Sequence, residues 1–107
     1  MKILFDQGTP VPLRRHLAAH QVDTAYERGW SALSNGDLLV EAERDGYELL
    51  VTTDRNLRYQ QNLATRQIAI VVLLSTSWPR IQQHLPVIQA VIDAAVASAY
   101  HEIPIPR

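Results

Sequence analysis

The sequence predicts an α/β domain with about four mainly parallel strands and helices on both faces of the sheet. Short apolar runs alternate with helical segments along the chain, which is typical of this fold class. Ile68 to Leu74 is an uninterrupted apolar run, as expected of a parallel strand covered on both faces. The length of 107 residues suits a single domain. We therefore expect residues 1–107 to form one domain.

The first half of the chain contains signals for two strands and two helices. Lys2 to Phe5 is a strand candidate, and Pro10-Val11-Pro12 begins a helix, because proline is favoured in a first helical turn. His20 to Ala25 contains valine and threonine and predicts a second strand. Ser34-Asn35-Gly36-Asp37 is typical of a helix start, and Asp45-Gly46 of a helix end.

The second half predicts two further strands separated by a short helix, followed by helical structure. Glu48 to Thr53 and then Ile68 to Leu74 are the strands, and Asn56 to Thr65 is the short helix. Residues 77–100 form a C-terminal helical segment, with a kink or a new helix start at Pro86. Residues 101–107 are expected to form an extended tail.

The composition is that of a soluble, cytoplasmic protein. The chain has no cysteine, which is typical of a reducing compartment. Its apolar stretches are too short to span a bilayer, so no membrane association is expected. The net charge of -1 gives no overall positive field, although nine of the ten basic residues are arginines, whose side chains match phosphate oxygens.

Three aspartates stand where predicted elements begin or end. Asp6 and Asp54 each follow a strand, and Asp37 lies at the head of a helix. The carboxyl ends of parallel strands share one edge of the sheet, so these side chains are expected at a common mouth. Clustered carboxylates repel one another unless they are neutralised, and Mg²⁺ or Mn²⁺ is the usual hard cation for such a site.

Each aspartate also has a purely structural interpretation. Ser34-x-x-Asp37 matches a capping box, in which the acid serves the first helical turn. Asp54 is a candidate cap for the helix that begins near Asn56. Asp6 precedes a loop with Gly8 and would then be a turn residue.

The order of these features resembles the compact PIN-like domains, which are predicted toxin nucleases related to the ribonuclease toxins of toxin-antitoxin modules. The resemblance rests on a first strand that ends in Asp6, a proline-bearing helix, a Gly-Asp at Asp37 and the strand end Val51-Thr52-Thr53-Asp54. It covers residues 1 to about 75. It implies a metal-dependent ribonuclease held in check by a cognate antitoxin protein.

The resemblance also implies which residues would act. Asp6, Asp37 and Asp54 would be the catalytic and metal-binding carboxylates, and Glu41, one helical turn beyond Asp37, would be a fourth ligand. Candidates for binding the RNA substrate are Thr52, Thr53, Arg14, Arg15, Arg55 and Arg58.

Two positions depart from the family pattern and keep a second function open. Gln7 and Asn56 stand where the family often has acids, and each keeps an oxygen acceptor without the charge. The alternative is therefore a degenerate PIN-like module that binds RNA or a partner without cutting. A phosphoacceptor receiver domain would need a lysine after the last strand, and Lys2 is the only lysine.

The apolar residues between Val87 and Ala99 recur at helical spacing. They are expected to cover the sheet. Their small side chains also suit a close contact with a second copy of the chain or with the antitoxin, so a homodimer is kept as an alternative.

Overall fold

The computed structural model describes residues 1–57 and 63–106 and contains an all-parallel sheet of five strands in the order β2-β1-β3-β4-β5. This confirms the predicted α/β class with a parallel sheet. The strands are β1 (Lys2–Phe5), β2 (Gln21–Thr24), β3 (Leu49–Thr52), β4 (Ala69–Leu73) and β5 (Tyr100–Ile103).

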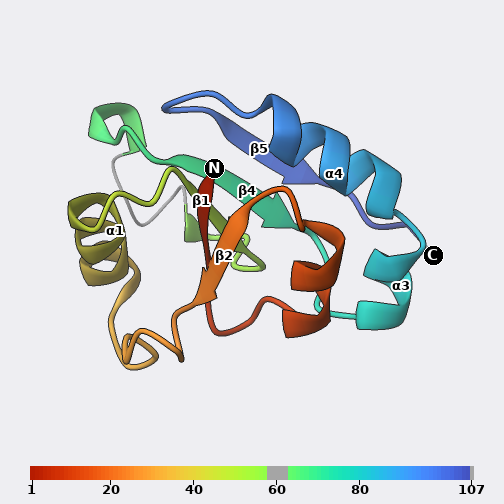
Figure 1. Cartoon of the computed structure of the whole chain (residues 1–107), viewed down its shortest axis with the longest axis horizontal. Coiled ribbons are helices and arrows are strands. Elements are labelled where there is room, and N and C mark those ends of the chain that lie inside the picture. Colours follow the sequence, from red (N-terminus) through yellow and green to blue (C-terminus); the bar gives the residue numbers. More distant parts are fainter. Residues whose placement is uncertain (58–62, 107) are drawn as a thin grey trace.

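Helices cover both faces of this sheet, as the sequence predicts (Figure 1). One face carries α1, and the other carries η1, α3 and α4. The helical elements are the 3-10 helix η1 (Val11–His16), α1 (Asn35–Arg44), the 3-10 helix η2 (Leu63–Thr65), α3 (Trp78–Gln82) and α4 (Leu85–Ala94).

The strands supply alternate side chains to two separate apolar layers. Ile3 and Phe5 point into the layer beneath α4, whereas Leu4 points into the layer beneath α1. All three are fully buried, and the central strands β3 and β4 are buried along their whole length. Doubly covered strands of this kind explain why Ile68 to Leu74 has no polar residue.

The fifth strand is the main difference from the predicted fold. Residues 77–100 were expected to be helical, yet α4 ends at Ala94 and Tyr100 already belongs to β5. Within the predicted extended tail, His101 to Ile103 belong to a strand that pairs with β4. An edge strand pairs on one side only, so its exposed His101 does not carry the apolar signature of a central strand.

Three helical predictions are refined. The helix at Pro10 to Pro12 is a 3-10 helix, and Pro86 lies in the first turn of a new helix, α4, rather than at a kink. The predicted helix from Asn56 to Thr65 falls partly on residues 58–62, outside the described residues, and its end is η2. Within the described parts of the chain, no helix has the length and apolar character needed to cross a membrane.

The strand order reverses direction between β1 and β3, because β2 lies to one side of β1 and β3 to the other. In open parallel sheets, ligands bind beyond the carboxyl ends of the strands at such a reversal. Asp6 follows β1 directly, and Asp54 follows β3 by two residues. The fold therefore places both carboxylates at its most favourable ligand-binding position.

Candidate functional site

Asp6 and Asp54 are brought together by one buried side chain, Thr52. The hydroxyl of Thr52 donates a hydrogen bond to Asp6 Oδ2 and accepts one from the backbone N–H of Asp54 at 3.0 Å. Thr52 is only 1 % exposed, so its hydroxyl has these two partners instead of water. Thr52, a candidate for binding the substrate, thus uses its hydroxyl within the protein.

Hydrogen bonds hold the Asp6 carboxylate in place, and its surroundings raise its pKa. Thr9 contributes a hydroxyl 2.8 Å from Asp6 Oδ1, and the backbone of Gly8 also bonds the carboxylate. Burial raises the pKa of Asp6 above its ordinary value, and the negative charge of Asp54 raises it further, while the bonds from Thr52, Thr9 and Gly8 oppose both effects. The site therefore contains a carboxylate whose charge is incompletely compensated.

Thr9 is placed to serve Asp6 in both protonation states. Its Oγ1 lies 2.8 Å from Asp6 Oδ1 and 2.8 Å from the carbonyl oxygen of Val51. One hydroxyl has one proton, so it cannot donate fully to both acceptors. A protonated Asp6 can donate to Thr9, which then donates to Val51; an ionised Asp6 competes with Val51 for the Thr9 proton.

Asp54 is oriented by its own loop and by helix α1. Its Oδ1 accepts a hydrogen bond from the Asn56 N–H at 2.9 Å, which is the local turn that its capping interpretation anticipated. Its Oδ2 accepts from the side-chain amide of Asn35 at 2.8 Å. Asn35 has no separate signal in the sequence, because it stands within the helix-start pattern from Ser34 to Asp37.

Asp37 and Glu41 have partners within or next to their own helix. The Asp37 N–H bonds the Ser34 hydroxyl at 3.3 Å, which is half of a capping box, and Asp37 is exposed. Glu41 forms an ion pair with Arg44 at 3.1 Å. Among residues 1–57 and 63–106, no three acidic or histidine side chains form a group that could hold one metal ion. The structure thus pairs Asp6 with Asp54 and provides no such group with Asp37 or Glu41.

The candidates for substrate binding have different surroundings. Arg14 bonds Glu27 at 2.8 Å and the Val22 carbonyl at 3.3 Å, so its charge is partly used. Arg55 is exposed and donates to the Leu74 carbonyl at 2.8 Å. Arg15 is exposed, Thr53 is half-buried, and Arg58 lies outside the described residues.

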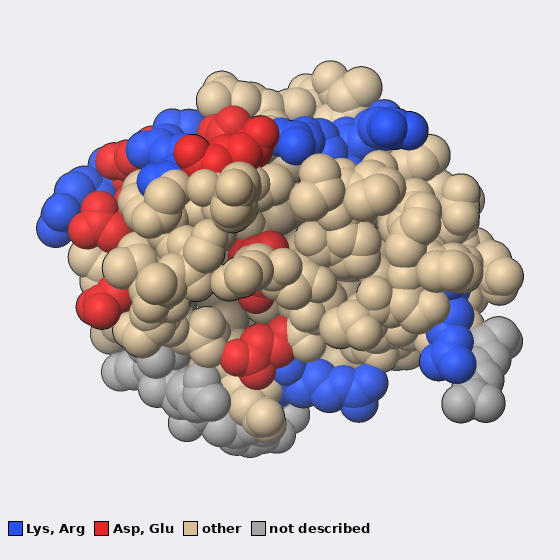
Figure 2. Space-filling view, turned by 90° about the horizontal axis from the view of Figure 1, so that it is seen from below, with Lys and Arg blue, Asp and Glu red and all other residues tan. Residues whose placement is uncertain are grey.

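Two hollows open on either side of Asp6 and share Asp6 and Gln7. The Trp30 hollow has a volume of about 170 Å³, and its remaining lining includes Trp30, Asn35 and Leu38. The Tyr26 hollow has about 340 Å³, and its remaining lining includes Val11, Arg14 and Tyr26. Figure 2 views the molecule from the side where the segments after β1 and β2 lie in Figure 1; acidic side chains lie near the middle of this face and also at its left and upper margins, and basic ones lie towards its margins.

Asp6 and Asp54 offer carboxylate oxygens, the type of ligand that Mg²⁺ prefers. Mg²⁺ is commonly held by one or two carboxylates, its remaining positions being filled by water and substrate phosphate rather than by a protein cage. Two carboxylates joined through Thr52 satisfy this requirement. Burial raises the pKa of Asp6 most, and the negative charge of Asp54 adds to it; a bound cation would favour the ionised form against both effects.

A network of charged and aromatic side chains fixes the segment that leads from β2 to α1. The guanidinium of Arg28 lies 4.5 Å from the ring centre of Trp30, bonds the Tyr47 hydroxyl at 2.9 Å and forms an ion pair with Asp45. Lys2 Nζ lies 4.4 Å from the centre of the Tyr47 ring and donates to the Asp45 carbonyl. Burial raises the pKa of Tyr47 to about 12, with a further contribution from its bond to a neighbouring aspartate.

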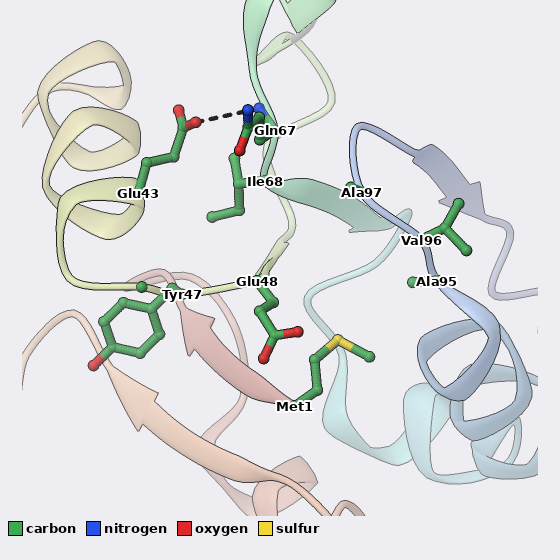
Figure 3. A pocket seen from close by; sticks show the side chains of 10 residues that line it. Met1, Glu43, Tyr47, Glu48, Gln67, Ile68, Ala95, Val96 and Ala97 are labelled. Carbon is green, nitrogen blue, oxygen red and sulfur yellow. Dashed lines mark hydrogen bonds between the residues drawn. The ribbon is translucent and has the colours of Figure 1, made fainter.

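Another hollow, of about 310 Å³, lies at the opposite edge of the sheet (Figure 3). Met1, Glu48 and Ile68, which precede β1, β3 and β4, are part of its lining. Glu43 in its wall accepts a hydrogen bond from the Gln67 N–H at 3.2 Å. The strands run between this hollow and the two carboxylates, so it is separate from the candidate site.

No protein-family model, curated protein or solved structure matches the chain. The chemistry of the site is therefore the basis on which a function can be assigned.

Proposed function

We propose that the protein is a metal-dependent ribonuclease that cleaves RNA phosphodiester bonds. The observation that carries this proposal is the pair of Asp6 and Asp54, linked through Thr52 at the reversal point of a parallel sheet. The resemblance to PIN-like domains supplies the reaction class. An ion such as Mg²⁺ or Mn²⁺ bound to this pair would activate a water molecule and stabilise the leaving oxygen.

The chain's own residues position the reacting groups. Asp6 and Asp54 would hold the ion, Thr52 keeps both in register, and Asn35 fixes the second oxygen of Asp54. Gln7, which lines both hollows, is placed to bond the RNA backbone through its amide. Asp37 and Glu41 enter this proposal only through the family resemblance.

The biological role that we propose is that of a toxin neutralised by a cognate antitoxin protein. Ile88 and Ile92 of α4 are buried against the sheet, as expected, while Val87 and Val96 stay exposed. Exposed apolar side chains on this segment are compatible with a docked antitoxin or a homodimer.

The test is cleavage of labelled single-stranded RNA with Mn²⁺, with and without a chelator. Asp6→Asn and Asp54→Asn are each expected to lower the single-turnover rate at least about 100-fold, because the ion loses a charged ligand. Asp93→Asn is the matched control, because Asp93 lies on α4 and bonds His20, which immediately precedes β2. It should cut as fast as the wild type.

The folding of Asp6→Asn distinguishes a chemical role from a structural one. The new amide can accept from Thr52 and donate to Thr9, which then donates to Val51, so the variant should melt at or above the wild-type temperature. Wild-type cleavage by this variant, or a melting point far below that of the wild type, would make Asp6 a structural residue.

The second candidate function is a module that binds RNA or a partner without cutting. It is favoured by the neutral Gln7 beside Asp6 and by Asn56, which uses its N–H on Asp54. The double variant Gln7→Glu, Asn56→Asp would restore two charges, so it should show a larger thermal shift with Mn²⁺ than the wild type. Absence of a shift in both proteins would favour the non-catalytic module.

A further inference from the structure

Tyr26 is the most exposed of the described large apolar and aromatic residues. Its side chain is 78 % exposed, whereas most of the chain's large apolar side chains are buried. Tyr26 follows β2 and lines the Tyr26 hollow together with Asp6. A single exposed aromatic residue is common on protein surfaces, so the informative feature of Tyr26 is its position in the same hollow as Asp6.

The turn that carries Tyr26 is held by reciprocal hydrogen bonds. The Thr24 N–H donates to Glu27 Oε1 at 2.9 Å, and the Glu27 N–H donates to the Thr24 hydroxyl at 3.1 Å. The Gly29 N–H bonds the Tyr26 carbonyl at 3.0 Å, and Gly29 has a φ of +74°, which glycine adopts without strain. Tyr26 is therefore presented on a fixed turn, which lowers the entropic cost of binding at its ring.

The Tyr26 hollow combines an apolar surface with polar groups on the side of the candidate site. Val11, 48 % exposed, contributes an aliphatic wall besides the Tyr26 ring, and Asp6 and the ion pair of Arg14 with Glu27 contribute charged groups. A nucleotide has the same division, with a flat apolar ring at one end and a phosphate at the other. The volume of about 340 Å³ lies at the lower end of the range for small-ligand sites and is ample for one base.

We propose that the Tyr26 hollow binds a single unpaired base of the RNA substrate, stacked on the Tyr26 ring, next to the phosphate that lies at Asp6. This rests on the proposed ribonuclease function and assigns one base-binding subsite of its RNA substrate to Tyr26. The two hollows share Asp6 and Gln7, so a strand crossing the site would place nucleotides on both sides of the reacting phosphate. A base inside a duplex has no free face for such stacking.

The experiment compares an intact single-stranded RNA with RNAs that each lack one base near the cleaved bond. In the wild type, removal of the base that occupies the Tyr26 hollow should slow cleavage about tenfold, a typical value for one base stacked on an aromatic side chain. Tyr26→Leu should slow cleavage of the intact RNA by the same factor. It should not change the cleavage rate of the RNA that lacks this base. Tyr26→Phe and Tyr26→Trp keep a ring and should cleave like the wild type.

The outcomes separate this proposal from the ribonuclease proposal. If cleavage needs Mn²⁺ and Asp6 but Tyr26→Leu cuts like the wild type, the base site is refuted and the ribonuclease stands. If neither the wild type nor any variant cleaves the RNA, the affinity for the same labelled RNA is measured by fluorescence anisotropy. Weaker binding by Tyr26→Leu than by Tyr26→Phe supports the base site, and equal binding or none overturns it. Asp93→Asn, on α4, is the surface control for both assays.

Discussion

The hydroxyl of Thr52 is the group on which the geometry of the two carboxylates depends most directly. Thr52→Val removes it with almost no change in shape or strand preference. Two partners are then lost, the bond to the Asp6 carboxylate and the acceptor for the Asp54 N–H. A bond to a charged group contributes about 1.5–3 kcal/mol and an orphaned buried N–H costs about 1–3 kcal/mol, so we expect a loss of about 2–4 kcal/mol in the free energy of unfolding.

Thr52→Ser is the matched control, because it keeps the hydroxyl and removes one methyl group. Loss of that buried methyl should cost about 1 kcal/mol. Urea denaturation of both variants without metal ions measures the difference. Equal stability of the valine and serine variants would refute the claim that the hydroxyl holds this site together.

The same pair of variants tests the electrostatics of Asp6. The Thr52 bond lowers the pKa of Asp6, against the raising effect of burial. Its removal should therefore raise that pKa further. Metal-dependent cleavage needs the ionised carboxylate, so the acidic limb of its pH profile should move to higher pH in Thr52→Val and stay in place in Thr52→Ser. An unmoved limb in the valine variant would contradict this reasoning.

Three further predictions concern the surroundings of Asp6. A Cβ on Gly8 would lie 2.6 Å from Thr53 Oγ1, so Gly8→Ala should destabilise the fold by about 1–2 kcal/mol, and Thr53→Ala should recover most of that loss in a double-variant denaturation series. Asp37→Asn should reduce Mn²⁺-dependent cleavage less than tenfold, roughly, because its backbone cap is kept; a loss as large as that of Asp6→Asn would place Asp37 at the ion. The pKa of Asp6 is raised in the folded protein, so the folded protein holds this proton more tightly than the unfolded chain does. This contribution to stability is fully present below the ordinary pKa of 3.8 and is lost as pH rises through the raised value. In melting experiments with a chelator, the melting temperature of Asp6→Asn should therefore lack this fall with rising pH.

The sequence predicts the central part of the fold because burial there is complete. The strands β1, β3 and β4 are short apolar runs bounded by polar turns, and their ends correctly place Asp6 and Asp54 on one edge. The edge strand β5 was not predicted, because a strand that pairs on one side only and is partly exposed to solvent does not need an apolar sequence pattern.

The site was only partly predictable for a related reason. A carboxylate that directly follows a strand has few local hydrogen-bond partners, so its position suggests a functional site. In the structure, Asp6 and Asp54 are linked through Thr52. Asp37 carries a local explanation in the same four residues that suggested a site, and the structure shows that local bond. Asn35 reaches Asp54 across 19 residues of sequence, a contact that depends on how α1 packs and has no signature in the chain.

Lys2, the only lysine, begins β1 at the end of the strand away from Asp6, with its amine held against the Tyr47 ring. Since it is the only lysine of the sequence, an amine-reactive reagent that modifies lysine side chains would attach at this strand-start edge. A protein coupled to a biosensor surface through the Lys2 amine would present Asp6, Asp54, the Trp30 hollow and the Tyr26 hollow to the solution. The same placement allows a fluorophore to be attached without touching the groups that would contact RNA.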